Sequence, residues 1–169
     1  MTRRAGCGAE WEMMDGGRSL IAPFITHHSS LITPGETCVI IGTGIDIVDL
    51  NRMQGLLDRH GNKFLAKTFT DGEIAYCQSR KKMVQHFAGR FAAKEAVFKA
   101  LGTGWRAGMG WKEIEVQVDS YGRPHLRLLG KVAAKARDLG ISEIFLSISH
   151  CDCHAVAFVI AQSRDVEGK

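Results

Sequence analysis

Two carboxylates occupy positions where folded chains rarely leave a charge. Asp46 lies between Ile45 and Ile47 in a run of β-branched residues, where strands usually avoid aspartate. Glu95 lies beside an apolar stripe of a helical stretch, next to Lys94. A charge at the edge of a buried face is costly unless it is paired or bound to a metal. Asp46 and Glu95 are therefore the first candidates for a functional role.

The stretch 90–104 predicts the central helix that carries Glu95. Alanine, lysine, glutamate and leucine dominate it, and Gly102 is the kind of residue that follows a helix C-terminus. At about 100° per residue, one apolar stripe forms, from Phe87, Phe91, Phe98 and Leu101. Three cations lie in the same helix: Arg90, Lys94 and Lys99. The alternative interpretation is an ordinary amphipathic helix with solvated charges.

The stretch from Cys38 to Leu50 predicts the strand that carries Asp46. Gly42 and Gly44 alternate with Asp46 on one face, which leaves room for a ligand or another backbone. A dinucleotide-binding fingerprint would need glycine or alanine at Ile47, and its glycines would follow the strand. The pattern therefore excludes that fold.

Basic residues follow along the next segments. The helix predicted over 49–66 has a basic outer side formed by Arg52, Arg59, Lys63 and Lys67, which is either solvated surface or a docking strip for an acidic protein. Thr70 or Asp71 caps a short helix. The run Arg80-Lys81-Lys82 is either a solvated turn or a contact for ligand phosphate.

The remaining segments favour an α+β fold. Strands are predicted over 111–119, 125–128, 144–150 and 155–161, with a short helix over 130–139. Strands outnumber the connections that could cross over in parallel, so we expect an antiparallel sheet with a long central helix. His150, Cys151, Cys153 and His154 offer four zinc ligands, but the spacing differs from common structural zinc sites, and in an extended segment the cysteines face away from the histidines. We therefore expect a strand end with His150 facing a site.

Length and composition indicate one domain. The chain has 169 residues, and 45% of them are hydrophobic. Its net charge of +4 suits an acidic or phosphate-bearing partner but is too small to indicate nucleic-acid binding by itself. Five cysteines without a secretory signal, and the lack of a long apolar run, predict a cytoplasmic protein with no membrane span. Residues 1–37 lack periodicity and are interpreted as a mostly disordered extension, which leaves 38–169 as the domain.

Three features occur in this order along the chain: Asp46 in a glycine-bearing strand, the block 90–104, and Ser147-Ile148-Ser149-His150. Together they resemble the holo-acyl-carrier-protein synthases, the small class of 4′-phosphopantetheinyl transferases. The resemblance covers roughly residues 39–163. It implies transfer of 4′-phosphopantetheine from coenzyme A to a serine of apo acyl carrier protein, with release of adenosine 3′,5′-bisphosphate.

The same resemblance implies roles for individual residues. Asp46 and Glu95 would bind Mg²⁺, which prefers one or two carboxylates together with phosphates. Lys99, and more loosely Arg90 and Lys94, would neutralise phosphate charge, and His150 would face the phosphates of coenzyme A. The base is left open among Glu95, a magnesium-bound water and His150. The family also implies a homotrimer with active sites between subunits, and it places Arg52 at the carrier-protein contact.

Two other classes of function were weighed. A non-enzymatic module that binds nucleic acid or an acidic protein gives no reason for Asp46 or Glu95, and the aromatic residues lie mostly at core spacings. A metal-dependent phosphohydrolase could use the same carboxylates but would normally need more ligands. The sequence thus favours a magnesium-dependent transferase that contacts neither nucleic acid nor membrane.

Overall fold

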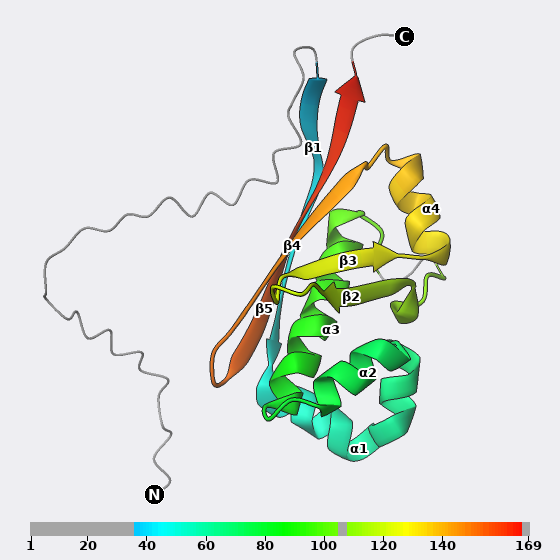
Figure 1. The fold of residues 1–169 in the computed structure, drawn as a ribbon. Helices are drawn as coiled ribbons and strands as arrows, with labels where there is room; N and C mark the ends of the chain where they lie inside the picture. The colour runs from blue at the N-terminus through cyan, green and yellow to red at the C-terminus, as the bar shows by residue number, and fades with distance from the viewer. Residues whose placement is uncertain (1–35, 105–107, 167–169) are drawn as a thin grey trace, which may run out of the picture. The chain divides into compact units, whose positions relative to one another are not determined.

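The computed structural model describes residues 36–104 and 108–166 (Figure 1). Its elements, in chain order, are β1 (Glu36–Asp49), α1 (Leu50–Thr68), α2 (Asp71–Gln78), α3 (Met83–Ala100), the 3₁₀ turn η2 (Trp111–Glu113), β2 (Ile114–Val118), β3 (Pro124–Leu128), α4 (Gly130–Asp138), β4 (Glu143–His150) and β5 (His154–Val166). Within this part of the chain, no helix is long and apolar enough to cross a membrane.

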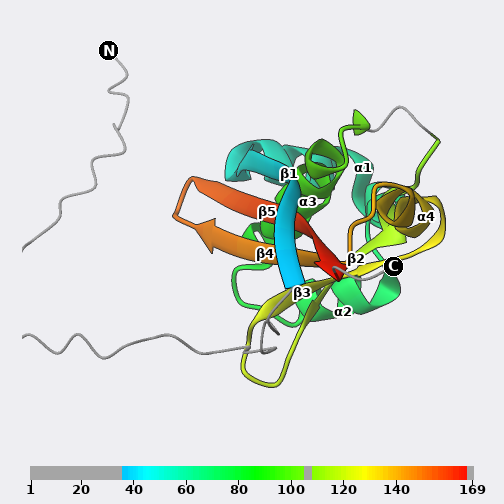
Figure 2. The same ribbon diagram turned by 90° about the horizontal axis from the view of Figure 1, so that it is seen from above.

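The strands form two antiparallel sheets. The larger one has the order β1-β5-β4, and β2 pairs with β3 in the smaller one. The helices lie on one side of the larger sheet, with α3 against it (Figures 1 and 2). The prediction of an α+β fold with an antiparallel sheet and a long central helix is confirmed. The described strands contain no parallel pair, as expected from the rejection of a dinucleotide-binding fold.

Helix α3 is buried on most of its surface and is the centre of the fold. Its core residues include Phe87, Ala92, Ala93, Ala96, Val97 and Phe98, each at 0% exposure. The sheet covers one side of α3, and α1, α2 and β2 contact the others. The alternative of an ordinary amphipathic helix with solvated charges is therefore wrong. The helix ends as predicted, because Gly102 adopts a φ of 68° that few other residues tolerate.

Close contact between β1 and α3 depends on the two strand glycines. A Cβ atom at Gly42 would lie 2.1 Å from the carbonyl oxygen of Ala100, and one at Gly44 would lie 1.9 Å from that of Ala96. Both distances are well inside van der Waals contact, so no larger residue fits without moving the helix. The room that the sequence predicted beside Asp46 is thus filled by another backbone, and this fixes Asp46 against α3.

Several predicted boundaries shift. β1 begins at Glu36, two residues before the predicted domain start, because β5 is long enough to pair with Glu36 and Thr37. Of the strand predicted over 111–119, the first three residues form η2. The predicted disorder of the extension 1–37 is wrong for residues 36–37, which lie in β1, whereas residues 1–35 lie outside the described part and their disorder stays a prediction.

Candidate active site

Asp46, Lys99 and Glu95 gather where the end of α3 crosses β1. Lys99 Nζ lies 2.8 Å from Asp46 Oδ1 and donates a second hydrogen bond of 2.7 Å to the carbonyl of Ile45. Asp46 pairs with Ala157, which is buried, so both side chains lie on the helix side of the sheet. Gly42 and Gly44 allow the close approach of α3 to β1, and this approach also brings the carboxylate of Asp46 to the ammonium of Lys99.

The pKa of Glu95 is raised above its ordinary value. Partial burial is the main cause, and the charge of Asp46 adds to it, whereas Lys99 and Arg52 act in the opposite direction. The carboxylates of Asp46 and Glu95 and the cations of Lys99 and Arg52 therefore lie close enough to interact electrostatically. Asp46 thus disfavours the charged form of Glu95. Because paired carboxylates are a donor set suited to a hard cation, these residues fit Mg²⁺.

Arg52 connects this group to the basic face of α1. It is exposed one turn into the helix, where its backbone N–H donates 2.7 Å to Asp49 Oδ1, the N-cap. Arg59 and Lys63 are exposed further along α1, which kinks at Gly61. The basic outer side predicted for this helix is therefore present, and its first residue lies near Glu95.

Arg90 lines a second, separate recess. A cleft of about 540 Å³ lies between α2, α3 and β2. Its lining includes Arg80, Arg90 and His125 and also the carboxylates of Glu73, Glu115 and Asp119. The guanidinium carbons of Arg80 and Arg90 lie 4.3 and 3.9 Å from the centre of the Tyr76 ring. Stacking of this kind fixes both cations in place. Of the two interpretations of the run Arg80-Lys81-Lys82, this contact of Arg80 with Tyr76 favours the phosphate contact over the solvated turn.

His150 lies next to this recess. A smaller cavity of about 160 Å³ shares Tyr76 and Arg90 with the larger one and is also lined by His86 and His150. The two imidazole rings lie 6.4 Å apart. The pKa of His86 is lowered by partial burial and by the charges of Arg90 and Arg80. His150 thus lines a cavity beside the guanidinium of Arg90, a group suited to contact with phosphate.

Lys94 does not join either group. Its side chain is fully buried and its ammonium binds Glu73 Oε2 at 2.8 Å, the carbonyl of Trp111 at 3.0 Å and the carbonyl of Ile114. All three N–H donors are used, so Lys94 has none left for a phosphate. The expectation that Lys94 helps to neutralise ligand phosphate is not supported by this geometry.

Helix α3 separates the remaining cations. Lys99 follows Arg90 by nine residues, which places the two side chains about 180° apart around the axis and about 14 Å apart along it. Their contacts agree, because Lys99 binds β1 and Arg90 stacks on α2. One chain therefore holds the carboxylates Asp46 and Glu95 with Lys99 on one side of α3 and the recess lined by Arg80 and Arg90 on the other.

Comparison with known proteins identifies the fold family. The model of the 4′-phosphopantetheinyl transferase superfamily matches residues 42–157. The chain belongs to this superfamily. It is 47% identical over 124 residues to a holo-[acyl-carrier-protein] synthase of Koribacter versatilis, across 73% of this chain and 99% of the relative.

Solved structures of the superfamily give the same result. The holo-[acyl-carrier-protein] synthase of Neisseria meningitidis matches with a TM-score of 0.67 and 36% identity, covering 73% of this chain and 98% of the other. The enzyme of Bacillus anthracis, solved in complex with coenzyme A (3′,5′-ADP), matches with a TM-score of 0.62 and 37% identity over 73% and 97%. The predicted family and enzyme class, a holo-[acyl-carrier-protein] synthase, are confirmed.

Sequence reasoning missed three residues of this phosphopantetheinyl transferase. Glu73 was not among the candidate residues, yet its carboxylate is the buried partner of Lys94. Tyr76 stacks under two arginines, and His86 faces His150. Glu73 was the one with a usable signal, because Thr70-x-x-Glu73 has the spacing of a capping box, which the structure contains.

Proposed function

We propose that this chain transfers the 4′-phosphopantetheine group of coenzyme A to a serine of apo acyl carrier protein, in a magnesium-dependent reaction that releases adenosine 3′,5′-bisphosphate. The observation that carries the proposal is the group formed by Asp46, Glu95 and Lys99 where α3 crosses β1. Acyl carrier protein and coenzyme A are the substrates named for, or bound in, the relatives.

Asp46 and Glu95 would hold Mg²⁺, and a bound Mg²⁺ would supply positive charge that stabilises the leaving phosphate. Lys99 hydrogen-bonds Asp46 and so keeps a positive charge beside the same carboxylates. In the transfer, the serine oxygen forms a bond to phosphorus, the bond to the bisphosphate leaving group breaks, and the serine loses its proton. The candidate acceptors of this proton are Glu95, His150 and a water bound to the metal.

The recess lined by Arg80 and Arg90 would take the nucleotide end of coenzyme A. Arg90 and Arg80 are held by Tyr76, and His150 lines the adjoining cavity, so each could contact phosphate with little loss of side-chain entropy. The pyrophosphate and the nucleotide belong to one molecule, yet the two groups lie on opposite sides of α3. This arrangement supports a shared site in which one copy supplies the carboxylates and a neighbour supplies the recess.

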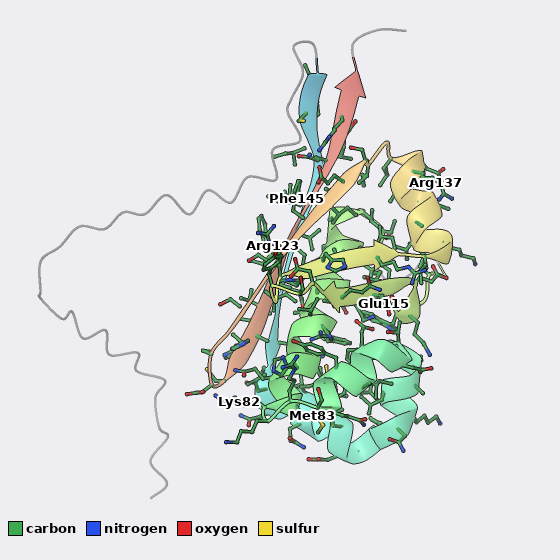
Figure 3. The ribbon with its side chains drawn as sticks, in the orientation of Figure 1. Lys82, Met83, Glu115, Arg123, Arg137 and Phe145 are labelled. Carbon is green, nitrogen blue, oxygen red and sulfur yellow. The ribbon has the colours of Figure 1, made fainter. Side chains whose placement is uncertain are left out.

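The outer face of the larger sheet supports the same assembly, a homotrimer. Ile45, Ile47, Phe145 and Phe158 are 59%, 62%, 45% and 41% exposed. They lie on the face away from α3, and Figure 3 shows Phe145 pointing away from the helices. A contiguous apolar surface of this kind marks an interaction site. Copies of this chain would cover it in the trimer.

Phe158→Glu tests the assembly. It places a charge in the central strand of the exposed face, so we expect the trimer to dissociate and transfer to fall with it. Size-exclusion chromatography with light scattering gives the mass. Tyr121→Glu is the control, because Tyr121 is 94% exposed in the β2–β3 turn and should change neither property. A Phe158→Glu chain that remains trimeric would show that this face is not the interface.

Arg52→Ala tests carrier-protein docking. Removal of an exposed cation at a docking surface should raise the KM for carrier protein about tenfold and weaken its salt dependence, with the KM for coenzyme A nearly unchanged. Alanine is preferred to glutamate because a new carboxylate would act on nearby Glu95. Arg137→Ala, on the exposed end of α4 (Figure 3), should have no effect. Equal changes for both substrates would instead place Arg52 in the nucleotide site.

One incubation tests the reaction itself. The full chain, apo acyl carrier protein, coenzyme A and Mg²⁺ are combined, and the intact mass of the carrier protein is measured. We expect a gain equal to one phosphopantetheine group, blocked when the metal is chelated. An unmodified carrier protein would contradict the proposed function, and hydrolysis of coenzyme A without modification would favour a phosphohydrolase.

A further inference from the structure

The turn between β4 and β5 brings together three ligand-bearing side chains that the proposed reaction does not use. Cys151 Sγ lies 3.4 Å from Cys153 Sγ, and His154 Nδ1 lies 3.2 Å from Cys153 Sγ. The three ligand atoms all lie within 4.8 Å of one another. The sequence predicted that the cysteines would face away from the histidines, which holds only for an extended segment. The segment turns at Asp152, and this brings the two thiols to the same side as His154.

We propose that Cys151, Cys153 and His154 bind Zn²⁺, with water in the fourth position. Zinc–sulfur bonds of about 2.3 Å in a tetrahedral site hold two sulfurs about 3.8 Å apart, so the observed 3.4 Å needs only a small adjustment. Soft thiolates with an imidazole select zinc over Mg²⁺. Cys151 is exposed and the other two ligands are half-buried, so solvent can reach the open position.

A carboxylate lies behind the histidine ligand. Asp49 Oδ2 is 3.8 Å from His154 Nε2, on the side of the ring away from the thiols. Negative charge there favours the tautomer with its proton on Nε2, which leaves the Nδ1 lone pair directed at Cys153. Metal-binding histidines commonly have such a carboxylate behind them. This arrangement favours a metal over a simple pair of redox-active thiols.

The turn is already fixed to the rest of the domain. The N–H of Leu50 donates 2.9 Å to the carbonyl of Cys153, and Gln85 Nε2 donates 3.0 Å to that of Cys151. Lys82 Nζ pairs with Asp152 at 3.3 Å, and Figure 3 shows Lys82 beside this hairpin. The starts of α1 and α3 therefore hold the ligands close together before any ion binds. Zinc would in turn fix the hairpin that carries His150.

Cobalt titration tests the site without relying on activity. The full chain is kept reduced, freed of metal with a chelator and titrated with Co²⁺, which shows a thiolate-to-cobalt absorption band only when sulfur is bound. We expect the band to saturate at about one Co²⁺ per chain and to vanish when Zn²⁺ displaces the cobalt. Ions held by Asp46 and Glu95 give no such band, so the two sites are distinguished.

Variants locate the ligands. Cys151→Ser should weaken the band and the double variant Cys151→Ser/Cys153→Ser should lose it, whereas Cys38→Ser, at an exposed cysteine of β1, should keep the full band. Asp49→Asn retains a capping side chain for α1 but should weaken zinc binding about tenfold. A melting temperature equal to that of the metal-free wild-type chain shows that a variant folds. We expect this of Cys151→Ser, because Cys151 is exposed.

Several outcomes would overturn the zinc site. They are the absence of a thiolate band in the wild-type chain, a band that survives in the double variant, and saturation at one ion for every two chains. Formation of a Cys151–Cys153 disulfide under mild oxidant, without any zinc binding by the reduced chain, would instead show that the two thiols are a redox pair.

Discussion

Replacing Asp46 by asparagine or Glu95 by glutamine should lower the rate of transfer by more than about 100-fold. Loss of a residue that only supports a metal ligand typically costs 10–100-fold, and these side chains are the proposed ligands themselves. Neutral amides are weak ligands for Mg²⁺, which prefers charged oxygen donors. Initial rates at limiting Mg²⁺, measured from the mass of the carrier protein, check the prediction.

The stability of the metal-free protein provides an independent readout. Because the pKa of Glu95 is raised in the folded state, the folded chain holds this proton more tightly than the unfolded chain does. Stability is therefore lost as the pH rises through the folded-state pKa, and Glu95→Gln removes that loss. At neutral pH the metal-free variant should melt no lower than the wild-type protein, and Mg²⁺ should raise the melting temperature of the wild-type protein alone.

A surface carboxylate serves as the matched control. Asp138→Asn, exposed at the end of α4, removes the same charge and should leave both the rate and the response to Mg²⁺ unchanged. Near wild-type turnover by Glu95→Gln at limiting Mg²⁺ would show that the metal assignment is wrong. Lost turnover together with a much lower melting temperature would point to a structural role instead.

The sequence was most informative where one residue type had a single physical reason to be present. Glycine at positions 42 and 44 implied close approach, and α3 fills that space. An aspartate among β-branched residues implied a function, and Asp46 meets the α3 residue Lys99. Strands that outnumber the possible parallel crossover connections implied antiparallel pairing, which the structure has. Each inference depended on local pattern and on one or two neighbours in the chain.

Sequence reasoning failed where the answer depended on which elements surround a side chain. Lys94 and Lys99 are both lysines of one helix, five residues apart, and nothing local separates their roles. One meets the buried Glu73 of α2 and the other meets the strand residue Asp46. The turn at Asp152 is a similar case, since the direction of Cys151 depends on how β4 pairs with β5.

Lys94→Met should destabilise the fold by about 3–5 kcal/mol, because it leaves the carboxylate of Glu73 buried without its cation. That carboxylate also accepts 2.9 Å from the N–H of Thr70 and 3.0 Å from that of Val116, so it joins α2, α3 and β2. Methionine matches lysine in length and leaves little cavity. Denaturant unfolding monitored by circular dichroism gives the change in unfolding free energy.

A double-mutant cycle separates the lost ion pair from other effects. In Glu73→Gln/Lys94→Met neither charge of this pair remains buried. The amide oxygen keeps one of the two backbone N–H partners of Glu73, and the amide NH2 can donate to a carbonyl that Lys94 leaves free, such as that of Ile114. The double variant should therefore be more stable than the sum of the single changes implies, by about 1–3 kcal/mol. Lys112→Met, at an exposed position of η2, should change stability by less than about 0.5 kcal/mol. If Lys94→Met unfolds like the wild-type protein but binds coenzyme A poorly, Lys94 contacts the phosphates after all and its buried ion pair does not stabilise the fold.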